Sequence, residues 1–144
     1  MIEASPLLGP VIILVGWSLL VLFYLAFVRF RAVKRADLKI DPRRGGRGQD
    51  LEAVLAPGDC YPAHNYTHLM EQPTIFYAIV FALVLMGFDH QINVLLAWTY
   101  VVLRIAHSIV QIFFNDLRIR FPLFLLSTFA LLGLTIHAGL RLWH

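Results

Sequence analysis

The stretch INVLLAWTYVVLRIAHSIVQIFF, residues 92–114, decides the fold class of this chain. Its length matches the roughly 20 residues that a helix needs to cross ~30 Å of hydrocarbon at ~1.5 Å per residue. Most of its side chains are large and apolar, but Arg104 and His107 lie within it. We therefore predict a membrane-spanning helix that carries a charged residue and a histidine inside an apolar sequence.

Three further apolar runs have a similar length, over about residues 7–28, 66–88 and 121–140. The chain is 59% hydrophobic and only 15% charged, and its mean hydropathy is +0.72, which is not typical of soluble domains. The first run lacks a basic segment before it and a small-residue cleavage site after it, so we expect a retained span rather than a signal peptide. The sequence predicts one all-α integral membrane domain over residues 1–144, a bundle of four transmembrane helices.

Basic residues are distributed unevenly between the predicted loops. Eight of the 12 Lys and Arg residues lie in segment 29–63, and Arg118 and Arg120 follow the third span. Because Lys and Arg are retained on the cytoplasmic side, we expect both loops to be cytoplasmic and both termini to lie on the other side. The basic segment also accounts for most of the net charge of +3, and it suits anionic lipid headgroups better than nucleic acid.

Polar residues recur every three or four positions in the third span: Arg104, His107, Ser108, Gln111 and Asn115. This period places them on one face of a helix. A charge in hydrocarbon costs several kcal/mol unless it faces a bundle interior or a watery cavity. We therefore expect this face to point toward other helices.

The second span has polar residues close together at its beginning: His64, Asn65, His68, Glu71 and Gln72. If this helix enters the membrane near His64, Glu71 and His107 both lie about 10 Å from the same surface. We expect an ion pair between Glu71 and either Arg104 or His107. Pro73 removes one backbone hydrogen bond beside Glu71 and is expected to bend the helix there.

Purely structural roles for these residues stay open. Buried ion pairs and polar stripes also fix helix register and oligomeric state. His137, alone among apolar residues of the fourth span, is expected to serve helix packing. A metal site is not favoured, because His64, His68 and Glu71 share a helix face without an HExxH motif or paired cysteines.

Three parts of the chain carry a resemblance to a known family: HNYTHLMEQPTIFYA in the second span, AWTYVVLRIAHSIVQIFFN in the third, and Arg120. They resemble the membrane-associated proteins in eicosanoid and glutathione metabolism (MAPEG), in particular their bacterial branch. The most specific parts are Glu71-x-Pro73 and Arg104-x-x-His107. The resemblance implies a four-helix bundle that forms a homotrimer, here in a bacterial inner membrane, with glutathione held between subunits toward the cytoplasmic side.

The positions that resemble the family's glutathione-contacting residues are Asn65, Glu71, Arg104, His107 and Arg120. His68 and Gln111 stand where better-known members have a Glu and a Tyr, and we include them among the substrate-binding candidates. Glutathione offers two carboxylates, an ammonium and a thiol, for which Arg and Glu are suitable partners. Arg120 occupies the position of an Arg that stabilises the thiolate in the family, which makes it the catalytic candidate. Phe121 stands where the prostaglandin-forming member has a Ser.

Two functions are open at this point. The first is a glutathione- or small-thiol-dependent transferase or peroxidase, with glutathione as co-substrate and small lipophilic electrophiles of the bilayer as substrates. The alternative is a non-catalytic lipid-binding or scaffold membrane protein of the same family. The expected partners are membrane lipids and further copies of the chain. A carrier built on Glu71 and His107 is less favoured, because the sequence shows no broken-helix repeat.

Reporter fusions test the predicted orientation. A periplasmic reporter enzyme fused after residue 144 is expected to be active, because the basic segment 29–63 should stay in the cytoplasm. A fusion near Gly45 is expected to behave as cytoplasmic. If a reporter fused after residue 144 were found in the cytoplasm, the predicted four-span orientation would be contradicted.

Overall fold

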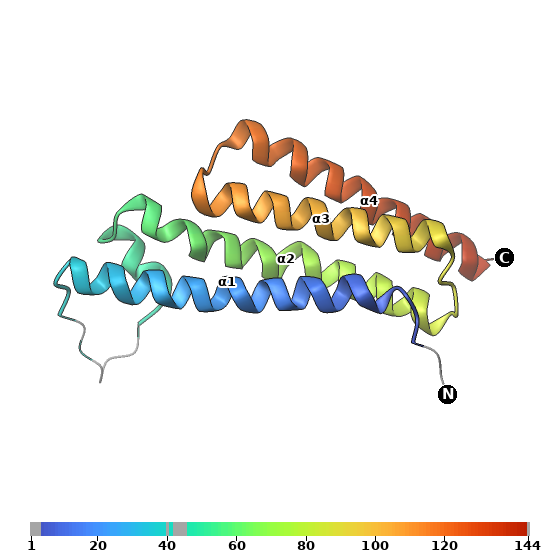
Figure 1. Cartoon of the computed structure of the whole chain (residues 1–144), viewed down its shortest axis with the longest axis horizontal. Coiled ribbons are helices and arrows are strands. Elements are labelled where there is room, and N and C mark those ends of the chain that lie inside the picture. The colour runs from blue at the N-terminus through green and yellow to red at the C-terminus, as the bar shows by residue number, and fades with distance from the viewer. Residues whose placement is uncertain (1–3, 40, 42–45, 144) are drawn as a thin grey trace.

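Four long helices run lengthwise beside one another (Figure 1). The structure is a computed structural model that describes residues 4–39, 41 and 46–143. The helices are α1 (Leu8–Arg35), α2 (Pro57–Leu85), α3 (Gln91–Phe113) and α4 (Leu117–Trp143), with a short 3-10 helix, η1 (Gly48–Ala53), between α1 and α2. Each of the four is long and apolar enough to cross a membrane. The prediction of an all-helical chain with four apolar spans is confirmed.

Two helices extend beyond the apolar runs that predicted them. α1 continues to Arg35, and α2 begins at Pro57 and passes through Pro62 and Pro73 without interruption. Pro57 lies in the first turn of α2, where a missing N–H removes no helical hydrogen bond. Segment 29–63, predicted as a loop, is therefore helical at both ends, and its residues 40 and 42–45 lie outside the described residues.

The longer α2 changes the position of Glu71 along its helix. Glu71 lies near the middle of α2, about 21 Å from either end at ~1.5 Å per residue. The helix begins before His64, because the polar segment ahead of residue 66 is helical and not a loop; the depth of Glu71 below the membrane surface stays a prediction. Glu71 is consequently a carboxylate halfway along a helix of membrane-spanning length.

Two short turns reverse the chain. Gly87 has a φ of +60°, a left-handed conformation that glycine adopts readily, and Phe88 N donates to Leu83 O across it at 2.9 Å. Asn115, with a φ of +52°, ends α3 in the same way. The start of α1, the α2–α3 turn and the end of α4 lie at one end of the bundle, which we call the terminal end (Figure 1). The described residues of segment 29–63, together with residues 114–120, form the opposite, basic end.

The core lies between α2 and α3, each of which contacts all three other long helices. At its centre the rings of Phe76 and Tyr100 stack, with centroids 4.3 Å apart. α4 approaches α3 closely where Gly133 faces Leu96. Large apolar side chains are exposed along the outside of the bundle, among them Phe23, Phe27, Leu95, Val102, Phe129 and Leu132. Such an apolar exterior is expected for a surface covered by lipid.

A substitution at Gly133 tests the α3–α4 contact. A Cβ at this position would lie 3.1 Å from Leu96 Cδ1, so Gly133→Val should overpack the interface and lower the free energy of unfolding by about 1–3 kcal/mol. Thermal or denaturant unfolding in detergent measures the effect.

Gly16 provides the matched control, because a Cβ there would meet no atom within 4 Å. Gly16→Val is expected to leave stability almost unchanged. Adding Leu96→Ala should restore part of the stability lost in Gly133→Val. Equal destabilisation at positions 16 and 133 would contradict the close packing of α3 and α4.

Candidate functional site

The polar face of α3 lies inside the bundle, as predicted. Arg104, His107, Ser108 and Gln111 are all buried, and their contacts reach α1, α2 and α4. The apolar residues between them fill the remaining faces of α3. A single helix thus presents a line of polar groups to the three helices around it.

Arg104 is held by α2 and α4. Its Nη2 donates to His68 O at 2.8 Å, and its Cζ lies 5.8 Å from the centroid of the Phe124 ring. Its side chain is buried with 1% of the residue exposed, yet Nε and Nη1 have no hydrogen-bond partner among the described residues. A buried N–H donor without a hydrogen-bond acceptor is unfavourable. These two nitrogens of Arg104 could therefore donate to an acceptor that the described residues do not provide.

The prediction of an ion pair between Glu71 and Arg104 or His107 is wrong, because the described residues form no such pair. Glu71 Oε2 lies instead 3.3 Å from His68 Nδ1, and the Glu71 side chain is 62% exposed. The reason is the rotation of α2: the backbone of His68 faces Arg104 inside the bundle, whereas Glu71 points outward. Similar depth along two helices did not bring the charges together.

His68 connects the inner and outer groups. Its ring centroid is 6.2 Å from that of His107, with the two rings nearly perpendicular, and His107 also lies beside Phe124 at 6.3 Å. Four of the predicted residues, Glu71, His68, His107 and Arg104, therefore form a contiguous cluster across α2 and α3. This cluster begins on the outer face of α2 and ends in the bundle core.

A second group of buried hydrogen bonds joins α1, α2 and α3. Asn65 Nδ2 donates to Ser108 Oγ at 2.6 Å, and Trp17 Nε1 donates to the same oxygen at 2.9 Å. Asn65 Oδ1 and Gln111 Oε1 are buried without a hydrogen-bond partner in the part of the chain that the structure describes. Trp17 was missed by the sequence analysis, because nothing in the apolar first span marks one aromatic residue as a donor to a distant helix.

Arg120 lies in the first turn of α4, outside the His68–Arg104 cluster. Its Nη1 donates to Asn115 Oδ1, a residue of the α3–α4 turn. Its Nε is buried and has no partner among the described residues. No hydrogen bond among the described residues joins Arg120 to the other predicted site residues. The Arg120 guanidinium is held by its hydrogen bond to Asn115 in the α3–α4 turn.

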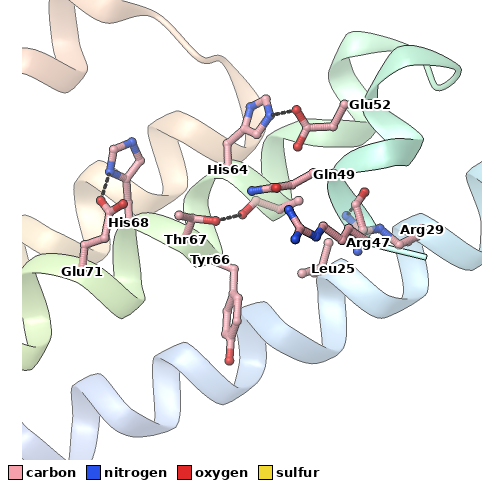
Figure 2. A pocket seen from close by; sticks show the side chains of 12 residues that line it. Leu25, Arg29, Arg47, Gln49, Glu52, His64, Tyr66, Thr67, His68 and Glu71 are labelled. Atoms are coloured by element: carbon pink, nitrogen blue, oxygen red, sulfur yellow. Dashed lines mark hydrogen bonds and ion pairs between the residues drawn. The ribbon is translucent and has the colours of Figure 1, made fainter. Parts of the chain in front are cut away.

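An open cleft of about 710 Å³ lies between α1, η1 and α2 at the basic end (Figure 2). His68 and Glu71 lie at one end of it, and Arg29 and Arg47 lie at the other. Between them the polar lining includes Gln49, Glu52, His64 and Thr67. Both arginines were expected only as part of a basic loop. In the structure Arg29 lies on α1 and Arg47 lies at the start of η1, and both line the cleft beside α2.

η1 is held against the two helices that border the cleft. Arg29 Nη2 donates to Gly48 O at 3.3 Å, and His64 Nε2 lies 3.1 Å from Glu52 Oε2. The Arg29 guanidinium also occupies the space that a side chain at residue 48 would need, so a larger residue there would displace the end of the flexible Arg29 side chain. These contacts order one wall of the cleft.

The cluster and the cleft together offer guanidinium donors, two carboxylates and three imidazoles within a membrane-spanning bundle. The profile of the MAPEG family matches residues 7–140, a range that includes all four long helices almost entirely and every predicted site residue. Neither the curated proteins nor the solved structures include a significant match to this chain. The extent of the profile match shows that the chain belongs to the MAPEG family.

Proposed function

We propose that this protein binds glutathione, or a small thiol with similar charged groups, and uses it to modify or reduce lipophilic electrophiles dissolved in the membrane. The observation that carries the proposal is the buried Arg104 guanidinium, of which Nε and Nη1 lack partners among the described residues. A carboxylate that accepts from Nη2 together with either Nε or Nη1 would form a bidentate pair and satisfy one of these two donors. The MAPEG family includes glutathione transferases and peroxidases, which supports this reading.

The neighbouring groups suit the rest of a charged tripeptide. Glu71 is a partner for an ammonium, and the Arg29 and Arg47 guanidiniums are partners for a second carboxylate. Asn65 and Gln111 each have a buried oxygen that would accept a hydrogen bond from a peptide N–H. The cleft volume of about 710 Å³ is in the range of ~300–1,000 Å³ that small-molecule sites occupy.

Arg120 is the proposed catalytic residue. A guanidinium beside the thiol stabilises the thiolate and raises the amount of nucleophile at neutral pH. In a transferase reaction, the thiolate sulfur forms a bond with the electrophilic carbon and the leaving group departs with the electron pair of the broken bond. In a peroxidase reaction, two thiols are oxidised to a disulfide while a hydroperoxide is reduced to an alcohol and water.

We propose that the site is completed by further copies of the chain in a homotrimer. Thr67, Glu71 and Thr74 are exposed on one face of α2, and Glu71 lies halfway along the helix. Facing lipid, this carboxylate would be unfavourable by several kcal/mol. A closed cyclic oligomer in which the face meets its neighbours removes that penalty, and the trimer is the assembly implied by the family resemblance.

The basic end is proposed to face the cytoplasm of a bacterial inner membrane, because Lys and Arg are retained on that side. The thiol would then enter the cleft from water, and the electrophile would arrive from the bilayer. Catalysis would take place where these two routes meet.

A non-catalytic lipid-binding role is the second candidate, and one groove favours it. This groove of about 250 Å³ at the basic end combines the apolar surfaces of Tyr24 and Phe27 with Arg31 and with Arg35, which forms an ion pair with Asp59 in the same groove. Aromatic walls below cations are suited to an anionic lipid. In addition, Phe121 occupies the position of a thiol-assisting Ser.

Equilibrium titration of glutathione into the protein in nanodiscs tests the leading proposal. We expect binding at millimolar or lower concentration, an ultraviolet absorbance from bound thiolate near neutral pH, and slow conjugation of a generic aromatic electrophile. Arg120→Ala should lower turnover by about 10²-fold, as loss of one charge-stabilising group does, while binding is largely retained through Arg104 and Glu71.

Arg118→Ala is the matched control, since Arg118 is an exposed arginine of the same helical turn. It should leave turnover unchanged. Loss of binding and turnover to the same extent in Arg120→Ala would contradict a role confined to the thiolate. If glutathione neither binds at millimolar concentration nor reacts, the lipid-binding function replaces the thiol-dependent one.

A further inference from the structure

A second pocket, mostly apolar in its lining, lies at the terminal end of the bundle, away from the cleft between α1, η1 and α2. It has a volume of about 420 Å³ and is formed by the α2–α3 turn, the start of α3 and the end of α4. Its lining residues are Phe88, His90, Ile92, His137, Leu140 and Arg141. None of these residues takes part in the proposed thiol chemistry.

His137 is held in one orientation by a buried amide. Asn93 is fully buried, and its Nδ2 donates to Phe88 O at 3.0 Å. That bond directs Asn93 Oδ1 to His137 Nδ1, at 2.8 Å. Because the amide oxygen only accepts, Nδ1 must carry the ring proton, and Nε2 of the neutral ring has a free lone pair. Nε2 makes no hydrogen bond in the described part of the chain.

Arg141 brings a cation to the same pocket. Its Cζ lies 5.5 Å from the centroid of the Phe88 ring, a contact that holds the guanidinium but uses none of its N–H donors. Arg141 forms no ion pair within the described residues. His90 Nδ1 already accepts from Ile92 N at 3.3 Å, and Asp89 of the same turn is not among the lining residues. The formal charge that lines the pocket therefore comes from Arg141.

Apolar side chains complete the site. Ile92 and Leu140 line the pocket and are both exposed. The pocket therefore offers a phosphate-binding cation, a hydrogen-bond acceptor and an apolar wall at the end of a membrane-spanning bundle. A membrane phospholipid has the three complementary groups: a headgroup donor, a phosphate and acyl chains.

We propose that this pocket binds a phospholipid whose headgroup carries a hydrogen-bond donor, as an ethanolamine or glycerol headgroup does. Arg141 binds the phosphate, His137 Nε2 accepts from the headgroup ammonium or hydroxyl, and Ile92 and Leu140 contact the first methylenes of the acyl chains. A choline headgroup has the same phosphate and chains but no donor. The site therefore distinguishes lipids by the headgroup donor.

Photolabelling with a phosphatidylethanolamine that carries a diazirine near its glycerol tests the proposal. In nanodiscs, mass spectrometry should locate labels in peptides containing residues 88–92 and 137–141. Arg141→Gln should lower labelling there by about fivefold, equivalent to ~1 kcal/mol, while labels elsewhere on the bundle stay unchanged. Arg118→Gln, the same charge change at the other end of α4, is the matched control and should have no effect at this site.

Two comparisons identify the ligand. The choline analogue with the same diazirine should label the pocket several times less than the ethanolamine lipid, and His137→Leu should abolish that difference. Equal labelling by the two lipids in the native protein would overturn the proposal, as would equal effects of Arg141→Gln and Arg118→Gln. Loss of labelling on addition of millimolar inorganic phosphate would also overturn it, because a free anion would then be the ligand.

Discussion

Burial of the Arg104 charge is the constraint on which the rest of the structure depends. With 1% of the residue exposed, a guanidinium inside a membrane bundle needs acceptors close by. α2 supplies the His68 carbonyl and α4 supplies the Phe124 ring, so both helices must pack against the same turn of α3. The described residues provide one hydrogen-bond acceptor for a group with five N–H donors, and this deficit supports the proposal that a ligand carboxylate binds there.

One turn of α2 links this buried charge to the exterior. The backbone of His68 binds Arg104 inside the bundle, while its side chain meets Glu71 outside, at the end of the cleft. A ligand with a carboxylate and an ammonium would thus meet opposite charges on two sides of the same turn. The outward position of Glu71 also supports the proposed oligomer, in which this face of α2 would contact another subunit.

Composition and periodicity were enough to predict four spans and the buried face of α3, because both follow from apolar run length and the 3.6-residue helical repeat. The partner of Glu71 could not be predicted in this way. Depth along a helix does not fix rotation about its axis, and the start of α2 at Pro57 was hidden in a polar, proline-containing segment. Arg47 reaches the cleft through the fold of η1, for which the sequence contains no periodic signal, and Arg29 lies on the part of α1 that continues beyond the predicted span.

Solid-state NMR of the protein in lipid bilayers tests the central claim most directly, that Arg104 is completed by a carboxylate of the thiol ligand. Guanidinium nitrogens are labelled with ¹⁵N and the glutathione carboxyl carbons with ¹³C, and their dipolar coupling is measured. Because Arg29 and Arg47 are the proposed partners of the second carboxylate, we expect two couplings, each corresponding to roughly 4 Å, the separation in a bidentate arginine–carboxylate pair. One of them should be lost in Arg104→Leu and neither in Arg118→Leu. The same couplings in native protein and Arg104→Leu, or none in native protein saturated with glutathione, would contradict the claim.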